Sequence, residues 1–212
     1  MPTGEYLVDP SAGIVAIPSH GGGPPATVER FSCAPGPAGW RYTASAHEPS
    51  TGAARGRVDV TVDSRWRPVR VELRAGGWWL RGGHAGREVL WVRGGDQAQE
   101  HAAEALGFGG ASPAFLISTG RALRLDVGAS ASVALVAVTG DVLATRTVRQ
   151  RWSLLEVAEH ATDLRPLRVE KFEVADLDTG SVAEVHLAGD VVLAAPGVEL
   201  LTLDGPPTAG SN

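Results

Sequence analysis

The sequence predicts a mainly β protein built on an antiparallel sheet, and the clearest evidence is a hairpin over residues 57–74. Apolar and polar residues alternate in both halves of this segment, with the apolar positions at Val58, Val60, Val62, Val69, Val71 and Leu73. A period of two is what a half-buried strand requires. Gly76 and Gly77 then form a turn that leads into Trp78 and Trp79, where a further strand is expected.

Short strands separated by turn residues run along most of the chain. Two strands are expected before the hairpin, at residues 28–31 and 40–45, and one after it at 88–93. The later strands are expected at 123–127, 133–137, 142–155, 167–174, 181–187, 191–194 and 198–203, with a turn at 139–141. About eleven strands at such short intervals are typical of a closed or strongly curled antiparallel sheet.

Two segments favour short helices that would cap the sheet. Residues 96–106 are rich in alanine, with Asp96 as a candidate N-cap and Gly107 directly after the last turn. Residues 153–160 carry Ser153 and Glu156 at the spacing of a capping box. We therefore expect one or two helices in an otherwise β protein.

The composition of the chain predicts one large domain between two flexible ends. Residues 1–27 contain several prolines and a run of glycines around short apolar stretches, and we expect them to form a flexible N-terminal arm. The β-barrel-like domain is expected to span residues 28–203. Residues 204–212 are expected to be a flexible tail.

Charge and cysteine content exclude several classes of protein. The net charge of −5 argues against binding to nucleic acid, which requires a basic surface. Cys33 is the only cysteine, so it has no partner within the chain, and a reducing, cytoplasmic location is expected. No segment approaches the roughly 20 apolar residues of a membrane span, and the N-terminus does not read as a signal peptide.

Motifs for catalysis, cofactors and metals are nearly absent from the sequence. No phosphate-binding loop, nucleophile elbow or set of three or four metal ligands at a recognised spacing is present, so no cofactor or metal is expected. His101 and Glu104 are three residues apart on the expected helix and could serve as an acid and a base. A small hydrolase or isomerase therefore stays open as an alternative function.

The tryptophans are the stronger signal for binding. The chain has six, including the adjacent Trp78 and Trp79, whose side chains must point to opposite faces of their strand. Inward tryptophans in a curled sheet either line an apolar cavity or fill the core, and the sequence leaves both open. Arg81 and Arg121 adjoin expected strands and could hold an anionic headgroup.

Three segments of the chain resemble the bacterial glycolipid-binding family, whose ligand is itself assigned by inference. Residues 107–117 read Gly-Phe-Gly-Gly-Ala-Ser-Pro-Ala-Phe-Leu-Ile and lead into Arg121. Residues 148–154 follow, with Trp152 where the family has a tyrosine, and residues 172–180 end in Asp-Leu-Asp-Thr-Gly. Ala114 and Phe115 replace the Thr-Asn-Thr core that is typical of the family.

The resemblance implies a single highly curved antiparallel sheet that forms a half-barrel or pseudo-barrel, similar to the periplasmic carriers of lipoproteins. It also implies non-enzymatic binding of a lipid-like or glycolipid-like apolar ligand in a cavity of the sheet. The side chains expected at that ligand are Trp66, Trp79, Trp91, Phe115 and Trp152 as apolar lining and Arg121 at the headgroup. A scaffold or interaction subunit, with a second copy of the chain as one conceivable partner, is a further alternative.

Overall fold

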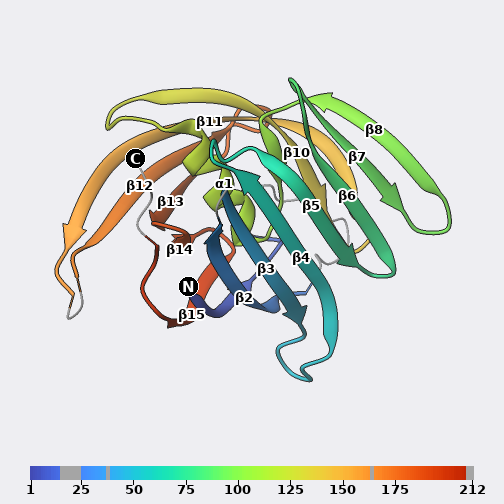
Figure 1. Ribbon diagram of the computed structural model, residues 1–212, viewed down its shortest axis with the longest axis horizontal. Helices are drawn as coiled ribbons and strands as arrows, with labels where there is room; N and C mark the ends of the chain where they lie inside the picture. The colour runs from blue at the N-terminus through green and yellow to red at the C-terminus, as the bar shows by residue number, and fades with distance from the viewer. Residues whose placement is uncertain (15–24, 37–38, 163–164, 209–212) are drawn as a thin grey trace.

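A computed structural model describes residues 1–14, 25–36, 39–162 and 165–208 of the chain. Within them the chain forms fifteen strands and one helix (Figure 1). The first eight strands are β1 (Thr3–Val8), β2 (Thr27–Gly36), β3 (Gly39–His47), β4 (Ala54–Asp63), β5 (Pro68–Ala75), β6 (Trp78–Ala85), β7 (Glu88–Gly94) and β8 (Ala98–Glu104). The remaining elements are β9 (Gly107–Gly109), α1 (Pro113–Leu123), β10 (Ser130–Thr139), β11 (Ala144–His160), β12 (Leu167–Asp176), β13 (Val182–Ala188), β14 (Val191–Ala195) and β15 (Val198–Asp204).

All the strands belong to one strongly curved sheet. Its order runs from β8 through β7, β6, β5, β4, β3, β2 and β1 to β15, and then back through β14, β13, β12, β11 and β10 to β9. Strands β2 to β8 form one wing and β9 to β15 form the other. Both are antiparallel meanders of neighbours in sequence, except that β9 pairs parallel with β10 and is joined to it through α1. The first strand of the chain, β1, lies between the wings and pairs antiparallel with both β2 and β15.

The two edge strands of the sheet follow one another directly in sequence. Only Ala105 and Leu106 separate the end of β8 from the start of β9. The Leu106 N–H donates to the Ala134 carbonyl oxygen at 2.9 Å, which ties this connection to β10. No pairing joins β8 to β9 in the described ranges, so the sheet is a curved half-barrel whose edges approach at one point without closing.

Helix α1 lies within the curve of the sheet (Figure 1). Ser112 is its N-cap and Pro113 its first residue, a combination that suits a helix start because proline lacks the N–H that would be unsatisfied there. Most of its length is buried, and a Cβ on Gly120 would come within 2.7 Å of the Leu187 side chain on β13. The glycine therefore lets the helix approach the sheet closely.

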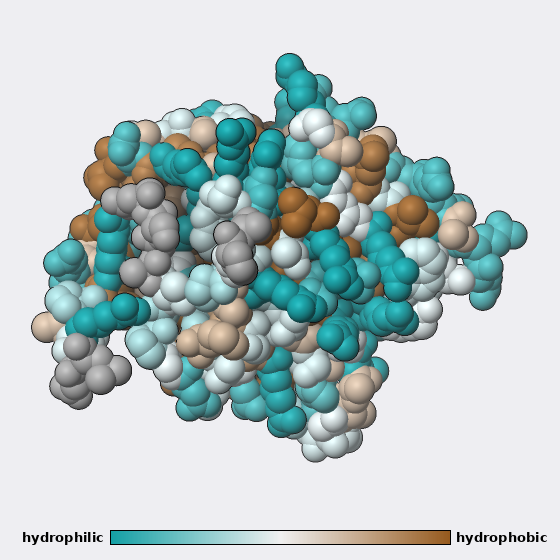
Figure 2. Space-filling model, in the orientation of Figure 1, coloured by the Kyte–Doolittle hydropathy of each residue, from teal (hydrophilic) through white to brown (hydrophobic). Residues whose placement is uncertain are grey.

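The core lies between α1 and the concave face of the sheet. Near the junction of the wings the rings of Tyr6, Phe31 and Tyr42 stack in series, with centroid distances of 4.7 and 5.7 Å. The face of the molecule seen in Figure 2 is mostly hydrophilic with small separate apolar groups. α1, the single helix of the described residues, is neither long nor apolar enough to cross a membrane.

The structure confirms the predicted fold class and the hairpin on which it rested. The fold is mainly β, in one large curved sheet that is antiparallel except for the β9–β10 pair, with one short helix. β4 and β5 pair antiparallel over the expected hairpin, and β6 begins at Trp78 as expected. The interior position of α1 differs from the expected cap on the sheet.

Both helices predicted from the sequence are wrong. Residues 96–106 contain β8, which pairs with β7 along its whole length, and residues 153–160 are the second half of β11. In both places pairing with a neighbouring strand overrides the helix propensity of alanine and the capping pattern. The helix that does form, α1, begins at a proline in a segment without an expected helix.

The predicted flexible ends are also partly wrong. Residues 3–8, expected in the flexible arm, form a strand that is paired on both sides. Near the other end, the Thr208 N–H donates to Asp190 Oδ1 at 2.7 Å, so the start of the expected tail is docked on the sheet. Residues 15–24 of the arm and 209–212 of the tail lie outside the described residues.

Tyr6 provides a test of the junction between the wings. Its ring is fully buried, and its hydroxyl accepts a hydrogen bond from the Val192 N–H of β14 at 3.0 Å. Tyr6→Phe should lower the free energy of unfolding by about 1–3 kcal/mol, because a buried N–H loses its acceptor. Chemical denaturation measures this change.

Thr202→Val is the matched control, because it also removes one hydroxyl, at an exposed position on β15. It should change the free energy of unfolding by less than about 0.5 kcal/mol. Equal effects of the two substitutions would contradict the role given to the Tyr6 hydroxyl.

Candidate functional site

Cavities lie at the two ends of α1. The larger, with a volume of about 450 Å³, is at the C-terminal end of the helix, and we call it the arginine cavity. Its described lining includes Trp66, Leu125, Leu154, Phe172, Arg121, Arg124, Arg165, Arg168, Asp126 and Glu170. The smaller, of about 180 Å³, is at the N-terminal end, and we call it the glutamate cavity after Glu29.

One wall of the arginine cavity is apolar and is built from several distant segments. Trp66 comes from the β4–β5 turn, Leu154 from β11 and Phe172 from β12. The Trp66 ring packs against Trp40 with a centroid distance of 5.3 Å. The sheet therefore brings together side chains that are far apart in sequence.

The remaining wall carries four arginines and two acids. Arg121 forms a buried ion pair with Glu170, and its Nε–H donates to the Gly189 carbonyl oxygen at 2.9 Å. Arg168 Nη2 lies 3.4 Å from the other carboxylate oxygen of Glu170, so this acid is shared by two guanidinium groups. The lining thus has an excess of positive charge.

The other two arginines are held by main-chain carbonyl groups. Arg124 donates to the Ser64 carbonyl oxygen at 3.1 Å, and Arg165 donates to the Pro207 carbonyl oxygen. A guanidinium group has five N–H donors, so each of these arginines keeps donors for a further acceptor. Such a cluster can bind an anionic group through charge-assisted hydrogen bonds.

Backbone strain is concentrated at the two cavities. Three non-glycine residues among those described have positive φ: Trp66 at 64°, Arg124 at 46° and Leu143 at 49°. Trp66 and Arg124 line the arginine cavity, and Leu143 lines the glutamate cavity. A left-handed conformation is unfavourable for such side chains, and strain of this kind is often found at functional sites.

A buried carboxylate, that of Asp190, lies next to the residues that support the wall of the arginine cavity. Asp190 accepts hydrogen bonds from the Trp40 indole N–H at 3.2 Å and from the Thr208 N–H at 2.7 Å. Cys33 Sγ lies 3.5 Å from the same carboxylate, and this environment, mainly through burial, raises the pKa of the thiol. Asp190 thereby fixes Trp40, which in turn supports Trp66.

A second buried acid lies at the other end of the helix. Glu29 on β2 is 3% exposed, and its Oε1 accepts hydrogen bonds from the Tyr42 hydroxyl at 2.7 Å and the Ser112 hydroxyl at 2.8 Å. Ser112 is the N-cap of α1, so this contact attaches the helix to the sheet. Burial raises the pKa of Glu29 above its usual value of 4.5.

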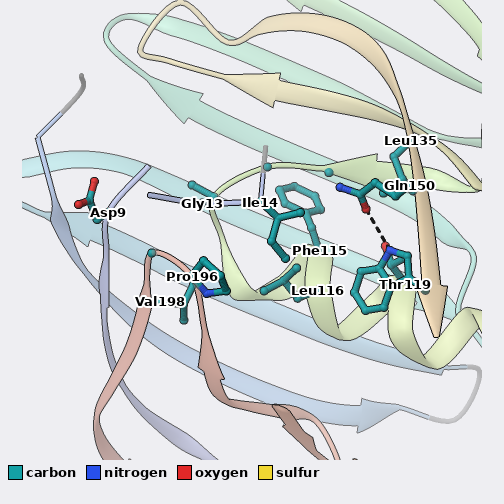
Figure 3. Close-up of a pocket in the computed structure, with 15 residues that line it drawn as sticks. Asp9, Gly13, Ile14, Phe115, Leu116, Thr119, Leu135, Gln150, Pro196 and Val198 are labelled. Atoms are coloured by element: carbon teal, nitrogen blue, oxygen red, sulfur yellow. Dashed lines mark hydrogen bonds between the residues drawn. The ribbon is translucent and has the colours of Figure 1, made fainter. Parts of the chain in front are cut away.

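A narrow crevice near the N-terminal half of α1 is shown in Figure 3. Its volume of about 20 Å³ is close to that of a single water molecule. Ile14 lies beside Phe115 there, and the Gln150 side-chain oxygen accepts a hydrogen bond from the Trp152 indole N–H at 3.0 Å. Trp152 is 1% exposed and serves as a core side chain.

The six ligand residues selected from the sequence do not share one cavity, and the arginine cavity contains only two of them. Trp66 and Arg121 both line the arginine cavity, whereas Phe115 lines the glutamate cavity and, together with Trp152, the crevice. Trp91 is buried and stacks on His101, with the ring centroids 5.3 Å apart. Trp79 is partly exposed, with the Arg81 guanidinium 5.7 Å from its ring, so neither Trp79 nor Trp91 lines a described cavity.

The acid and base pair of the enzymatic alternative is not assembled. His101 and Glu104 lie on β8 rather than on a helix, and residues three apart on a strand point to opposite faces. Glu104 pairs instead with Arg87, the two side chains being 2.8 Å apart. Across the described ranges, no three histidine, cysteine or acidic side chains gather as metal ligands.

The sequence did not point to Arg124, Arg165 and Arg168 of the arginine cavity, or to Glu29 of the glutamate cavity. Ser112 followed by Pro113 is a helix-start signal that could have located α1. Arg165 and Arg168 flank the start of a correctly expected strand, but nothing in the sequence indicates that they face Trp66. The burial of Glu29 has no local signal either, because it follows from pairing and from the distant Ser112.

Comparison with known proteins identifies one similar fold. A crystal structure of a DUF1089 family protein from Pseudomonas aeruginosa matches this chain with a TM-score of 0.57 and 15% sequence identity. The match covers 89% of this chain and 99% of the other. At this identity the likeness shows the fold alone. No family model matches the sequence, and no curated protein matches it.

Glu29 predicts a specific dependence of stability on pH. Because burial raises its pKa above 4.5, the folded state favours the protonated carboxyl more than the unfolded chain does. The contribution of Glu29 to stability is therefore full below about pH 4.5 and declines as the pH rises through the folded-state pKa. Tyr42 stays protonated in this range, because burial raises the pKa of its hydroxyl.

Glu29→Gln keeps the hydrogen-bond acceptor and cannot ionise. The free energy of unfolding of the native protein, relative to that of Glu29→Gln, should fall as the pH rises from 4 to 8, measured by urea denaturation at each pH. The same difference at every pH would show that Glu29 does not titrate differently in the folded state.

Proposed function

We propose that the protein binds an amphiphilic small molecule, with an apolar body and an anionic headgroup, in the arginine cavity without transforming it. The observation that carries this proposal is that one cavity joins an apolar wall, including Trp66, Leu154 and Phe172, to four arginines. The apolar wall accommodates the body of the ligand. The guanidinium groups accommodate its headgroup.

The chemistry of the lining suits such a ligand. Planar guanidinium groups bind carboxylate and phosphate through paired hydrogen bonds. The two acids of the lining leave part of the positive charge of the arginines uncompensated. The volume of about 450 Å³ is within the range of sites that hold drug-sized ligands.

Binding without catalysis is favoured by the residues around the cavity. Its described lining contains no histidine, cysteine, lysine or serine, and one of its two acids, Glu170, is paired with Arg121 and Arg168. A lipid or glycolipid with a phosphate or carboxylate group would be one ligand of this class, in keeping with the resemblance of the sequence to the glycolipid-binding family. A cytoplasmic location is part of the proposal, supported by the single cysteine, Cys33, which is buried.

A comparison of decyl phosphate, decanol and inorganic phosphate distinguishes recognition of the anionic headgroup from recognition of the apolar body. We expect decyl phosphate to bind more tightly than either of the others, measured by isothermal titration calorimetry. Arg165→Gln combined with Arg168→Gln should weaken binding of decyl phosphate about 10- to 100-fold, because charge-assisted hydrogen bonds are lost. Binding of decanol should change little.

These two arginines are the best positions to change, because Arg121 continues to pair with Glu170 when they are replaced. Arg87→Gln is the matched control, since its side chain is 88% exposed and pairs with Glu104 of edge strand β8. Equal affinity of the double variant and the native protein for decyl phosphate, at equal melting temperatures, would contradict the proposal.

A further inference from the structure

The glutamate cavity is separate from the arginine cavity. The two share no described lining residue and lie at opposite ends of α1, a helix of 11 residues and about 16 Å in length. Ser112 and Phe115, at the start of the helix, line the glutamate cavity. Gly120 and Arg121, near its end, line the arginine cavity. A ligand in one cavity therefore need not contact the other.

Glu29 brings an unused hydrogen-bonding atom to the glutamate cavity. Both of its hydrogen bonds, from Tyr42 and Ser112, end on Oε1. In the described part of the chain, Oε2 accepts no hydrogen bond, and it is not one of the fully enclosed polar atoms, so it keeps access to the cavity that the side chain lines. The attachment of α1 accounts for Oε1 alone, so Oε2 is available for a hydrogen bond to a molecule in the cavity.

Much of the rest of the lining is apolar. Val58, Leu73, Val138 and Leu143 contribute apolar side chains. The charged residues of the lining besides Glu29 are Arg55, Arg57, Arg74 and Asp141. Arg55 pairs with Glu48, and no described ion pair joins any of the arginines to Glu29.

We propose that the glutamate cavity is a second binding site, which takes a small uncharged molecule with an apolar body and one hydroxyl or carbonyl group anchored at Oε2 of Glu29. Its volume of about 180 Å³ is close to the roughly 150 Å³ of an apolar cavity that accepts benzene. A molecule of one ring and one polar group fits that space. The site is independent of the proposed function of the arginine cavity.

The charge state of the carboxyl group agrees with an uncharged ligand. Burial raises the pKa of Glu29, which favours the protonated form. A protonated carboxyl group can both donate and accept a hydrogen bond, as a hydroxyl group on a ligand can. An anionic ligand would be disfavoured at Glu29 once the carboxyl group ionised.

Benzyl alcohol, toluene and benzoate test the proposal because they share one ring and differ in the polar group. Binding is measured at neutral pH by titration of the 15N-labelled protein in NMR spectra. We expect saturable shifts at the backbone amides of Gly110, Ser112 and Ala75 with benzyl alcohol. Toluene should bind about 10-fold more weakly, because it leaves Oε2 without a partner, and benzoate more weakly still.

Two variants distinguish the contribution of the hydrogen bond to Glu29 from that of the cavity volume. Glu29→Leu removes the anchor, so benzyl alcohol should bind it no better than toluene does. Ala75→Leu fills the cavity without changing Glu29 and should abolish binding of both, which keeps the test decisive if Glu29→Leu does not fold. The Arg165→Gln and Arg168→Gln variant should bind benzyl alcohol with unchanged affinity, so failure of the amphiphile proposal would not affect this result.

Three outcomes would overturn the proposal. They are no saturable binding of benzyl alcohol to the native protein, equal affinity for toluene and benzyl alcohol, and undiminished binding of benzyl alcohol to Ala75→Leu.

Discussion

The antiparallel pairing of β1 with both β2 and β15 is the constraint on which the rest of the structure depends. These two ladders join a wing formed by β2 to β8 to a wing formed by β9 to β15. Without β1 no strand pairing would join the two wings in the described ranges, and the chain itself would link them through residues 105 and 106. Tyr6 strengthens the junction, because it stacks on Phe31 of one wing and accepts a hydrogen bond from β14 of the other.

The curvature that follows from this junction creates an interior that α1 fills only in part. The helix enters directly after the edge strand β9 and is held by Ser112 at its start and by Arg121 and Arg124 at its end. The helix packs closely on the sheet at Gly120, in its C-terminal half, and the open space lies at its two ends. The two cavities and their strained residues are therefore consequences of where the helix is anchored.

The parts of the fold that could be predicted from the sequence are those in which local alternation and pairing agree. The hairpin of β4 and β5 is an example, because its partner strands are adjacent and each buries one face. β8 could not be predicted, since its alanines favour a helix until β7 pairs with them. β1 was missed because one of its partners, β15, lies almost 200 residues away in sequence.

The candidate site, too, could be predicted from the sequence only in part. Trp66 and Arg121 were selected as residue types that suit an amphiphile, and they do share a cavity, but Trp79, Trp91 and Trp152 were selected on the same grounds and do not line it. What separates them is their place on the curved sheet and beside α1, which depends on the whole topology.

Native mass spectrometry of the freshly purified protein tests the central claim, that the arginine cavity holds an anionic amphiphile, most directly. Our account predicts one bound amphiphile per chain, either retained from the cell or taken up from added decyl phosphate, and its loss from the Arg165→Gln and Arg168→Gln variant. A native protein that is empty and stays at the mass of the chain when decyl phosphate is added would contradict it, as would a variant that binds equally well.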